Sequence, residues 1–200
     1  MDTRIRPASP SPSPKDRCVV QGEGFSGWQA LNDTVMGGRS SGQCSWGPAG
    51  LRFTGNLVEE GGGFISVRSP LFSPPLDLSF ARGLELVLRG EGRRFKLAVA
   101  CADGMGGLSE WIPGGLRWVK EFSTECEGEC HVAIPFSDLI PSLRAQPLER
   151  LPLGLPLRFD AGRITRLQLL HSRFSDDGGP NPGFRAGPIQ LDLHGIYALA

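Results

Sequence analysis

Residues 28–41 read Trp-Gln-Ala-Leu-Asn-Asp-Thr-Val-Met-Gly-Gly-Arg-Ser-Ser, and the rest of the chain is organised around this stretch. Asn32 and Asp33 carry side chains of the kind that bind backbone amides two residues further on and so fix a turn. Gly37 and Gly38 allow positive φ angles or the close approach of another backbone segment. The stretch predicts a rigid, shaped corner. For Asp33 we favour a bond to the amides of its own turn over binding of a cation or of sugar hydroxyls.

Short runs in which apolar and polar residues alternate follow the corner, as expected of strands with one face in a core. They lie at residues 51–57, 63–69, 84–89, 93–101, 116–123, 130–134, 163–171 and 187–199. The 28 glycines and 17 prolines indicate many turns, and no segment has a convincing helical pattern. We predict an all-β fold, an antiparallel two-sheet β-sandwich of the jelly-roll kind.

Several of these runs carry more local predictions. Residues 84–89 and 93–101 alternate on either side of a short turn with two glycines, which is the pattern of a β-hairpin. In the second run Phe95 falls on one face, and Arg94 and Lys96 fall on the other. Basic residues recur at positions 93, 94, 96, 163, 166 and 173, and we prefer a solvated sheet face to a functional basic patch. Residues 141–156 are expected to be irregular.

Composition limits the class of protein. The 200 residues suit one domain, with a disordered Pro/Ser-rich tail at residues 1–17 and the sandwich at residues 18–200. Twenty-one basic and 21 acidic residues cancel, so no field of one sign favours nucleic acid as a partner. The chain has no signal-like apolar run and no stretch near the roughly 20 apolar residues that span a bilayer. We expect a cytoplasmic protein whose membrane contact is peripheral at most.

The sequence offers little for catalysis or metal binding. Five cysteines at irregular spacing, an odd number, argue against a disulfide framework. Cys126 and Cys130 form the one close pair, which would clip a turn or hold half of a metal site, and we expect no metal. His131, His171 and His194 are scattered and lack a partnered nucleophile, so no acid–base pair follows. We therefore expect no enzyme and no cofactor.

Four stretches stand out in order along the chain: the corner, Phe-Thr-Gly-Asn-Leu at 53–57, Gly-Gly-Phe-Ile-Ser-Val-Arg at 62–68 and Ile-Pro-Phe at 134–136. In this order they resemble the complex I intermediate-associated protein family, over a span from about Trp28 to Tyr197. The resemblance implies a galactose-binding-like β-sandwich that assists the assembly of respiratory or photosynthetic membrane complexes. It also implies no catalytic residues, since none is established across the family.

The resemblance places the candidate partner-binding residues without fixing a role for any of them. They are Asn32, Asp33, Thr34, Met36, Gly37, Gly38, Ser40, Gly63, Phe64, Ser66 and Arg68. We add Trp111, which lies in a loop and is the best candidate for a binding ring, whereas core or turn packing is favoured for Trp28 and Trp46. Partner recognition would centre on residues 32–41 and on a hairpin at residues 62–68.

The leading hypothesis is a non-enzymatic, monomeric assembly factor. It would bind protein subunits or intermediates of an NADH dehydrogenase-type or photosynthetic membrane complex. The alternative is a carbohydrate-binding module, because sandwiches of this kind often bind sugars. A third reading makes the chain an enzyme subunit or redox regulator acting through Cys126 and Cys130.

Overall fold

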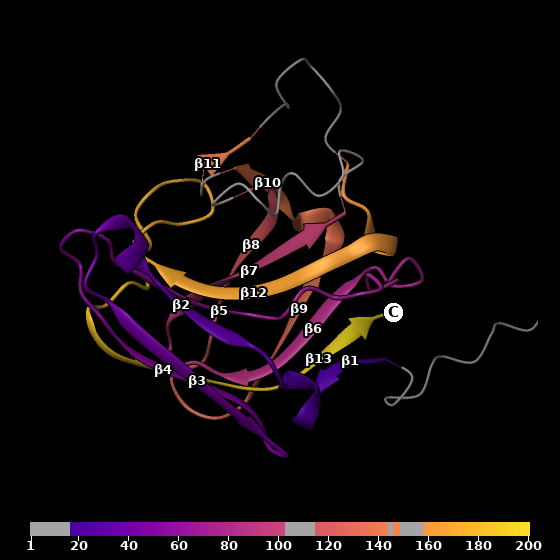
Figure 1. Ribbon diagram of the computed structural model, residues 1–200, viewed down its shortest axis with the longest axis horizontal. Coiled ribbons are helices and arrows are strands. Elements are labelled where there is room, and N and C mark those ends of the chain that lie inside the picture. The colour runs from indigo at the N-terminus through magenta and orange to yellow at the C-terminus, as the bar shows by residue number, and fades with distance from the viewer. Residues whose placement is uncertain (1–16, 103–114, 144–145, 149–157) are drawn as a thin grey trace, which may run out of the picture.

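Two antiparallel β-sheets packed face to face make up the structure (Figure 1). The computed structural model describes residues 17–102, 115–143, 146–148 and 158–200. Sheet A contains β1 Cys18–Gln21, β3 Ser41–Gly47, β4 Gly50–Leu57, β6 Gly83–Arg89, β9 Cys130–Pro135 and β13 Gly187–Leu199. Sheet B contains β2 Gln29–Asn32, β5 Phe64–Arg68, β7 Arg94–Cys101, β8 Arg117–Ser123, β10 Ile140–Leu143, β11 Gln146–Pro147 and β12 Ile164–Ser172.

Short 3-10 turns join some of the strands, and no α-helix occurs in the described part of the chain. The turns are η1 Gly22–Phe25, η2 Asp33–Met36, η3 Phe136–Asp138 and η5 Ala161–Arg163. The predicted all-β, two-sheet sandwich is therefore confirmed. The expected tail falls almost wholly on residues 1–16, which lie outside the described residues, as does Trp111.

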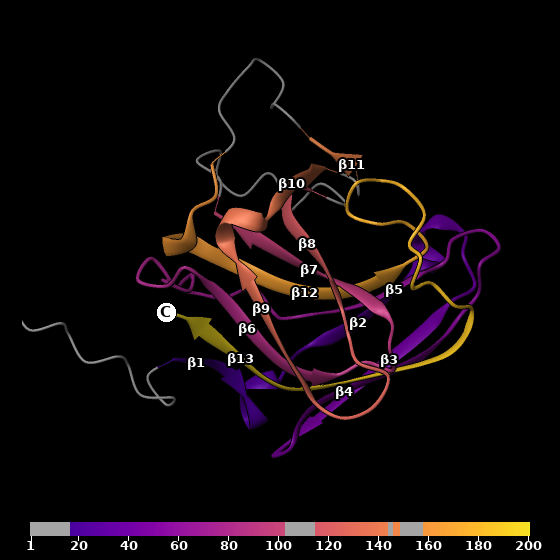
Figure 2. The ribbon, with the colours of Figure 1, turned by 180° about the vertical axis from the view of Figure 1, so that it is seen from behind.

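Each sheet has a defined strand order. Sheet A runs β3-β4-β13-β6-β9, with β1 also paired to β13, and sheet B runs β11-β10-β8-β7-β12-β5-β2. The long strand β13 pairs with β4 along its first half and with β6 along its second half. Figure 2 shows the same two layers from behind, with β9 and β6 in front of β13. Neighbouring strands are thus mostly distant in sequence.

The core lies between the two sheets. Alternate side chains of the strands point into it, among them Phe53 and Leu191 from sheet A and Phe95, Val99 and Leu169 from sheet B, all essentially buried. Burying a side chain of this size contributes about 1.5–3 kcal/mol. The alternation that predicted the strands is therefore the pattern that fills the core.

The hairpin predicted at residues 84–101 is wrong. Strand β6 pairs with β13 and β9 in sheet A, whereas β7 pairs with β12 and β8 in sheet B, so the link between them crosses from one sheet to the other. Arg93 holds this crossing, because its guanidinium donates to the carbonyl of Arg185 at 2.5 Å and to that of Pro188 at 2.7 Å. Alternation shows that each strand has one buried face, and it does not distinguish strands that lie side by side from strands that face each other across a core.

Residues 62–68 are not part of a hairpin either. Strand β5 lies in sheet B between β12 and β2, whereas the preceding strand β4 lies in sheet A between β3 and β13. The chain again crosses between sheets, here through residues 58–63. The glycines at positions 61–63 do form the predicted turn, and Gly61 and Gly63 have φ angles of 78° and 93°.

Three smaller expectations also need correction. Arg93 and Lys96, expected on a solvated face, are only 4% and 5% exposed. Trp46, expected to pack in a core or turn, is 44% exposed, whereas Trp28 is buried as expected. Part of the supposedly irregular segment 141–156 belongs to β10, which pairs with β8, and to β11; residues 144–145 and 149–156 lie outside the described residues.

Candidate functional site

The corner at residues 28–41 joins the two sheets. Strand β2 ends at Asn32 in sheet B, η2 occupies residues 33–36, and β3 begins at Ser41 in sheet A. The second crossing, residues 58–63 between β4 and β5, lies directly against it. The corner is therefore the place where the chain passes between the layers twice.

The carboxylate of Asp33 ties these two crossings together. Its Oδ1 accepts a hydrogen bond from the amide of Ser40 at 2.9 Å, and its Oδ2 accepts one from the Ser40 hydroxyl at 2.8 Å. From the second crossing, Oδ2 accepts the amide of Gly63 at 2.8 Å and the amide of Phe64 at 3.3 Å. The side chain is fully buried. Asp33 thus bonds its own corner, as favoured above, and also the neighbouring loop, which the sequence did not indicate.

Ser40 extends this connection. Besides donating to Asp33, its hydroxyl oxygen accepts a hydrogen bond from the amide of Val58 at 3.1 Å. The backbone amide of Gly38 donates to the carbonyl of Asp33 at 3.1 Å, which closes η2. We call the set Asp33, Ser40, Val58, Gly63 and Phe64 the Asp33 knot. Each buried polar atom of the carboxylate is satisfied, so the knot is a rigid structural unit.

Two glycines leave room for the carboxylate. A Cβ atom at Gly38 would lie 2.2 Å from Asp33 Cγ, and one at Gly62 would lie 2.3 Å from Asp33 Oδ2. Gly37 is needed for a different reason, because its φ of 84° closes the turn. The sequence motif therefore has a steric explanation: at positions 38 and 62 any larger side chain would displace the buried acid.

Hydrogen-bond donors, and not a neighbouring positive charge, stabilise the charged form of Asp33. Burial by itself would raise the pKa of this carboxyl, but the hydrogen bonds from Ser40, Gly63 and Phe64 outweigh it and lower the pKa below its ordinary value. No ion pair joins Asp33 to any residue in the described part of the chain. A buried, charged acid that already accepts hydrogen bonds from three backbone amides and one hydroxyl is poorly suited to act as a base or to bind a ligand.

The other predicted site residues divide into groups. Thr34 and Gly37 are exposed beside the knot, and Asn32 is half-buried. Ser66 and Arg68 lie further along β5: the Ser66 hydroxyl is buried and accepts from Gln168 at 2.9 Å, and Arg68 is half-buried opposite Gln168 and Gln29. Met36 is in η2, and its side chain lies outside the described residues.

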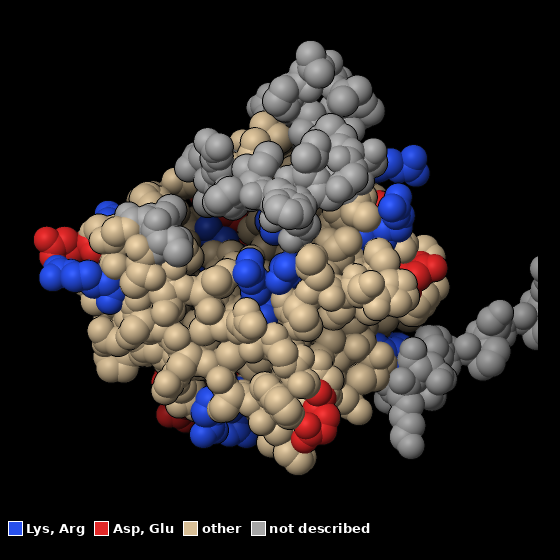
Figure 3. All heavy atoms as spheres, in the orientation of Figure 1, with Lys and Arg blue, Asp and Glu red and all other residues tan. Residues whose placement is uncertain are grey.

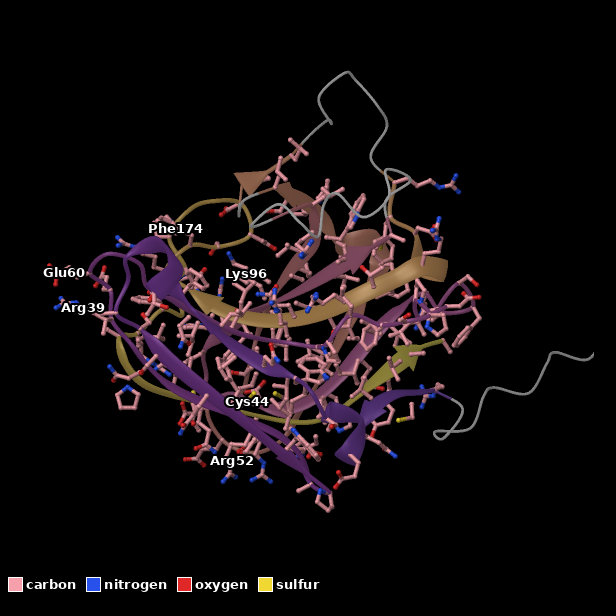
Figure 4. The ribbon with its side chains drawn as sticks, viewed as in Figure 1. Arg39, Cys44, Arg52, Glu60, Lys96 and Phe174 are labelled. Carbon is pink, nitrogen blue, oxygen red and sulfur yellow. The ribbon has the colours of Figure 1, made fainter. Side chains whose placement is uncertain are left out.

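A polar surface with one aromatic ring surrounds the knot. Arg39 forms an ion pair with Glu60 across the two crossings, and both side chains are exposed. Arg173 donates its amide to the carbonyl of Gly63 at 3.0 Å, and its guanidinium lies 5.3 Å from the ring centre of Phe174, which is 51% exposed. We call Thr34, Arg39, Glu60, Arg173 and Phe174 the corner surface. Figure 4 shows Arg39, Glu60 and Phe174 at the same end of the molecule, and in Figure 3 charges of both signs meet there.

Sequence reasoning missed part of this surface. Arg173 and Phe174 follow β12, more than 100 residues from the corner. Arg173 was considered only as one of several basic residues on a solvated sheet face, and Phe174 was not singled out. Only the crossing of the chain between sheets brings them beside Gly63. Val58 was missed for the same reason, whereas Gly62 belonged to a motif already recognised.

No reactive centre is evident in the described part of the chain. All five cysteines are free, including Cys126 and Cys130, and burial raises the pKa of the Cys101 thiol to about 11. His171 is fully buried and shares a hydrogen bond of 2.6 Å between Nδ1 and the carbonyl of Arg94, while His131 and His194 both face Glu129 at the surface. No group of three or more His, Cys, Asp or Glu side chains among the described residues is arranged to hold a metal ion.

Comparisons with solved structures define the class of fold. The family 11 carbohydrate-binding module from Clostridium thermocellum, solved in complex with a beta-1,3-1,4-mixed-linked tetrasaccharide, is similar with a TM-score of 0.59 and 15% identity, covering 92% of this chain and 95% of that one. The family 11 module of the Clostridium thermocellum cellulosomal cellulase Lic26A-Cel5E has the same TM-score and identity and is covered over 94% of its length. At this identity the likeness establishes the β-sandwich fold alone.

The family is established by sequence. The model of the family described as complex I intermediate-associated protein 30 (CIA30) matches residues 19–193, and the chain belongs to this family. This membership supports a role related to complex I assembly at the level of the family. A search of curated proteins finds no match. None of the described helical segments is long and apolar enough to cross a membrane.

Proposed function

We propose that this protein is a non-enzymatic assembly factor that binds a subunit or an intermediate of an NADH dehydrogenase-type or photosynthetic membrane complex. The match of the family model over residues 19–193 is the observation that carries the proposal. The Asp33 knot supports the non-enzymatic reading, because the single acid of the motif already accepts four structural hydrogen bonds.

The corner surface is the contact surface in this proposal. Phe174 offers a half-exposed ring of the kind that anchors protein interfaces, and the ion pairs Arg39–Glu60 and Arg173–Glu59 offer a polar rim around it. The Asp33 knot holds both crossings in place. A surface that is ordered before binding loses little conformational freedom when the partner docks.

Affinity purification of the tagged protein from its own cells, after crosslinking in mild detergent, tests the proposal. Phe174→Ala and Arg39→Glu change the corner surface without touching the knot. Trp46→Ala and Arg52→Glu are the matched controls, since Trp46 is also an exposed ring and Arg52 is also an exposed arginine in an ion pair, with Asp192. All four variants are first shown to be folded by circular dichroism.

The expected result is that wild type and both controls enrich subunits of one membrane complex and that the two corner variants enrich them less. Failure of the wild type to enrich any complex would sink the assembly-factor proposal. Equal loss in the controls would place the contact elsewhere on the molecule.

The second candidate, a carbohydrate-binding module, has the fold of its structural neighbours in its favour. It is tested on the same protein by titrating soluble β-glucans while recording tryptophan fluorescence. Saturable binding of a glucan, together with no enrichment of a membrane complex, would favour this alternative over the assembly factor.

A further inference from the structure

The long link between β5 and β6 displays apolar side chains to solvent. Leu71 is 52% exposed and Phe80 is 66% exposed, and the neighbouring Pro70, Pro74 and Pro75 are exposed as well. These two are among five large hydrophobic residues that stand out from the described surface. Other residues of the same link, Leu76 and Leu78, turn inward. The link therefore places some of its apolar side chains in the core and leaves Leu71 and Phe80 in solvent.

The link is firmly attached to the rest of the molecule. Phe72 donates its amide to the carbonyl of Thr165 at 2.9 Å, and Leu78 donates to Ala161 at 2.8 Å. Leu76 and Ile164 exchange two backbone hydrogen bonds, of 2.8 and 3.0 Å. Figures 1 and 2 both show the link at one end of the sandwich, beside the start of β12 and the C terminus. The apolar side chains thus project from an ordered scaffold.

Basic groups accompany them at this end. Three arginines are exposed there, and none forms an ion pair with a residue that the structure describes: Arg82, Arg158 and Arg163. The backbone places them, since Arg82 donates its amide to Leu199 and Arg163 belongs to η5, which follows Arg158 closely. Figure 3 shows charged groups of both signs at this end, at the right.

The acids at this end are engaged locally. The carboxylate of Asp77 accepts the amide of Ser79 at 3.0 Å, and that of Asp160 accepts the amide of Gly162 at 3.0 Å. Asp138 accepts from the hydroxyl of Ser137 at 3.1 Å. Asp77 and Asp160 each close their own turn, and Asp138 bonds the serine beside it. In the described part of the chain none of the three acids forms an ion pair with Arg82, Arg158 or Arg163. The guanidinium groups remain available for an external anion.

We propose that this end, defined by Leu71, Phe80, Arg82, Arg158 and Arg163, docks on an anionic lipid surface. Separate apolar side chains projecting from a rigid scaffold suit insertion between lipids, which requires no matching pocket, and arginines beside them suit lipid phosphates. The proposal goes beyond the assembly role. It concerns the end marked by the link between β5 and β6, whereas partner binding was assigned to the corner surface, which surrounds the Asp33 knot.

Cosedimentation of the purified chain with vesicles tests the proposal. Vesicles of phosphatidylcholine alone are compared with vesicles of phosphatidylcholine mixed with phosphatidylglycerol. The variants are Phe80→Ser, Leu71→Ser and the pair Arg82→Gln with Arg163→Gln. Trp46→Ser and Arg52→Gln are the matched controls, an exposed ring and an exposed arginine on sheet A.

We expect the wild-type chain to bind the mixed vesicles. Binding should fall about tenfold in Phe80→Ser, because one ring would no longer be buried among the lipids, and it should be unchanged in the controls. The arginine pair should lose the preference for phosphatidylglycerol. Wild type that leaves both kinds of vesicle unbound, or controls that lose binding equally, would overturn the proposal.

Protein docking at the same end is the competing outcome. Phe80→Ser is therefore also carried through the affinity purification described above. If it loses the membrane-complex subunits while wild type binds no vesicle, this end is a protein interface and the lipid proposal is wrong. If vesicle binding is lost and subunit enrichment is kept, the two surfaces are independent.

Discussion

Asp33 shows how one buried carboxylate organises a corner. Its four hydrogen bonds come from two separate crossings between the sheets, so removing it would leave three backbone amides without an acceptor. Gly38 and Gly62 leave the space that its carboxylate occupies. The role of the motif Asn-Asp-Thr-Val-Met-Gly-Gly-Arg-Ser is therefore first structural, and its functional value follows from the surface that it holds in place.

The steric part of this account predicts the effect of adding one methyl group. Gly38→Ala and Gly62→Ala should each lower the free energy of unfolding by roughly 2 kcal/mol or more, because the new Cβ would overlap the Asp33 carboxylate. Gly47→Ala is the matched control, since nothing lies within 4 Å of a Cβ at that position. Urea denaturation of the three variants measures the difference. Equal stability of all three would show that the corner can relax around the added methyl group.

His171 predicts a dependence of stability on pH. Burial lowers the pKa of this imidazole from 6.5 to about 4; the hydrogen bond to Arg94 opposes the shift, and the nearby charges of Arg93, Arg185 and Lys96 add to it. The unfolded chain therefore takes up the proton first as the pH falls. The contribution of His171 to stability is complete above about pH 6.5 and is lost progressively down to about pH 4, a change of about 3 kcal/mol.

Urea denaturation at about pH 7 and about pH 4.5 measures this change. In His171→Asn the drop in unfolding free energy between the two pH values should shrink, whereas in His131→Asn, at the surface, it should match wild type. A drop of the same size in His171→Asn would assign the acid sensitivity to groups other than His171. Asp33 would not be among them, because its lowered pKa places its effect at more acidic pH.

Among the elements, the crossings between sheets are the least visible in the sequence. The alternation in residues 51–57, 84–89, 93–101 and 187–199 correctly predicted β4, β6, β7 and β13. The partner of each strand was not predictable in the same way. The sequence of residues 84–101 shows two half-buried strands joined by a short glycine turn. This pattern fits a hairpin within one sheet, and it fits equally well a chain that crosses from one sheet to the other. The burial of Arg93 distinguishes the crossing from a hairpin, but it could not be predicted, because a basic residue beside a turn is normally expected to be exposed.

The crossing between β6 and β7 should depend on Arg93. Arg93→Met keeps an apolar stem but leaves the carbonyls of Arg185 and Pro188 without their donors, and should cost roughly 2–3 kcal/mol of unfolding free energy. Arg94→Met is the neighbouring control, because it loses only a partly exposed ion pair with Glu121, worth about 1 kcal/mol or less. Thermal denaturation compares the two. A larger loss in the Arg94 variant would contradict the assigned role of Arg93.

For the molecule as a whole, the class of fold followed from alternation and turn composition, and the family followed from a few motifs. The site could be predicted only in part. Asp33, Gly38, Ser40, Gly63 and Phe64 do come together, because they belong to motifs that the sequence displays. Arg173 and Phe174 join them through tertiary structure alone, and a single sequence gives no sign of that.

The central claim is that the corner surface binds a subunit of a membrane complex. Site-specific photocrosslinking tests it most directly, with a photoreactive amino acid in place of Phe174 and, in a matched experiment, in place of Trp46. The account predicts an adduct between position 174 and a subunit of a respiratory or photosynthetic complex, and none with that subunit from position 46. Adducts of equal yield from both positions, or no subunit captured from position 174 in a folded protein, would contradict it.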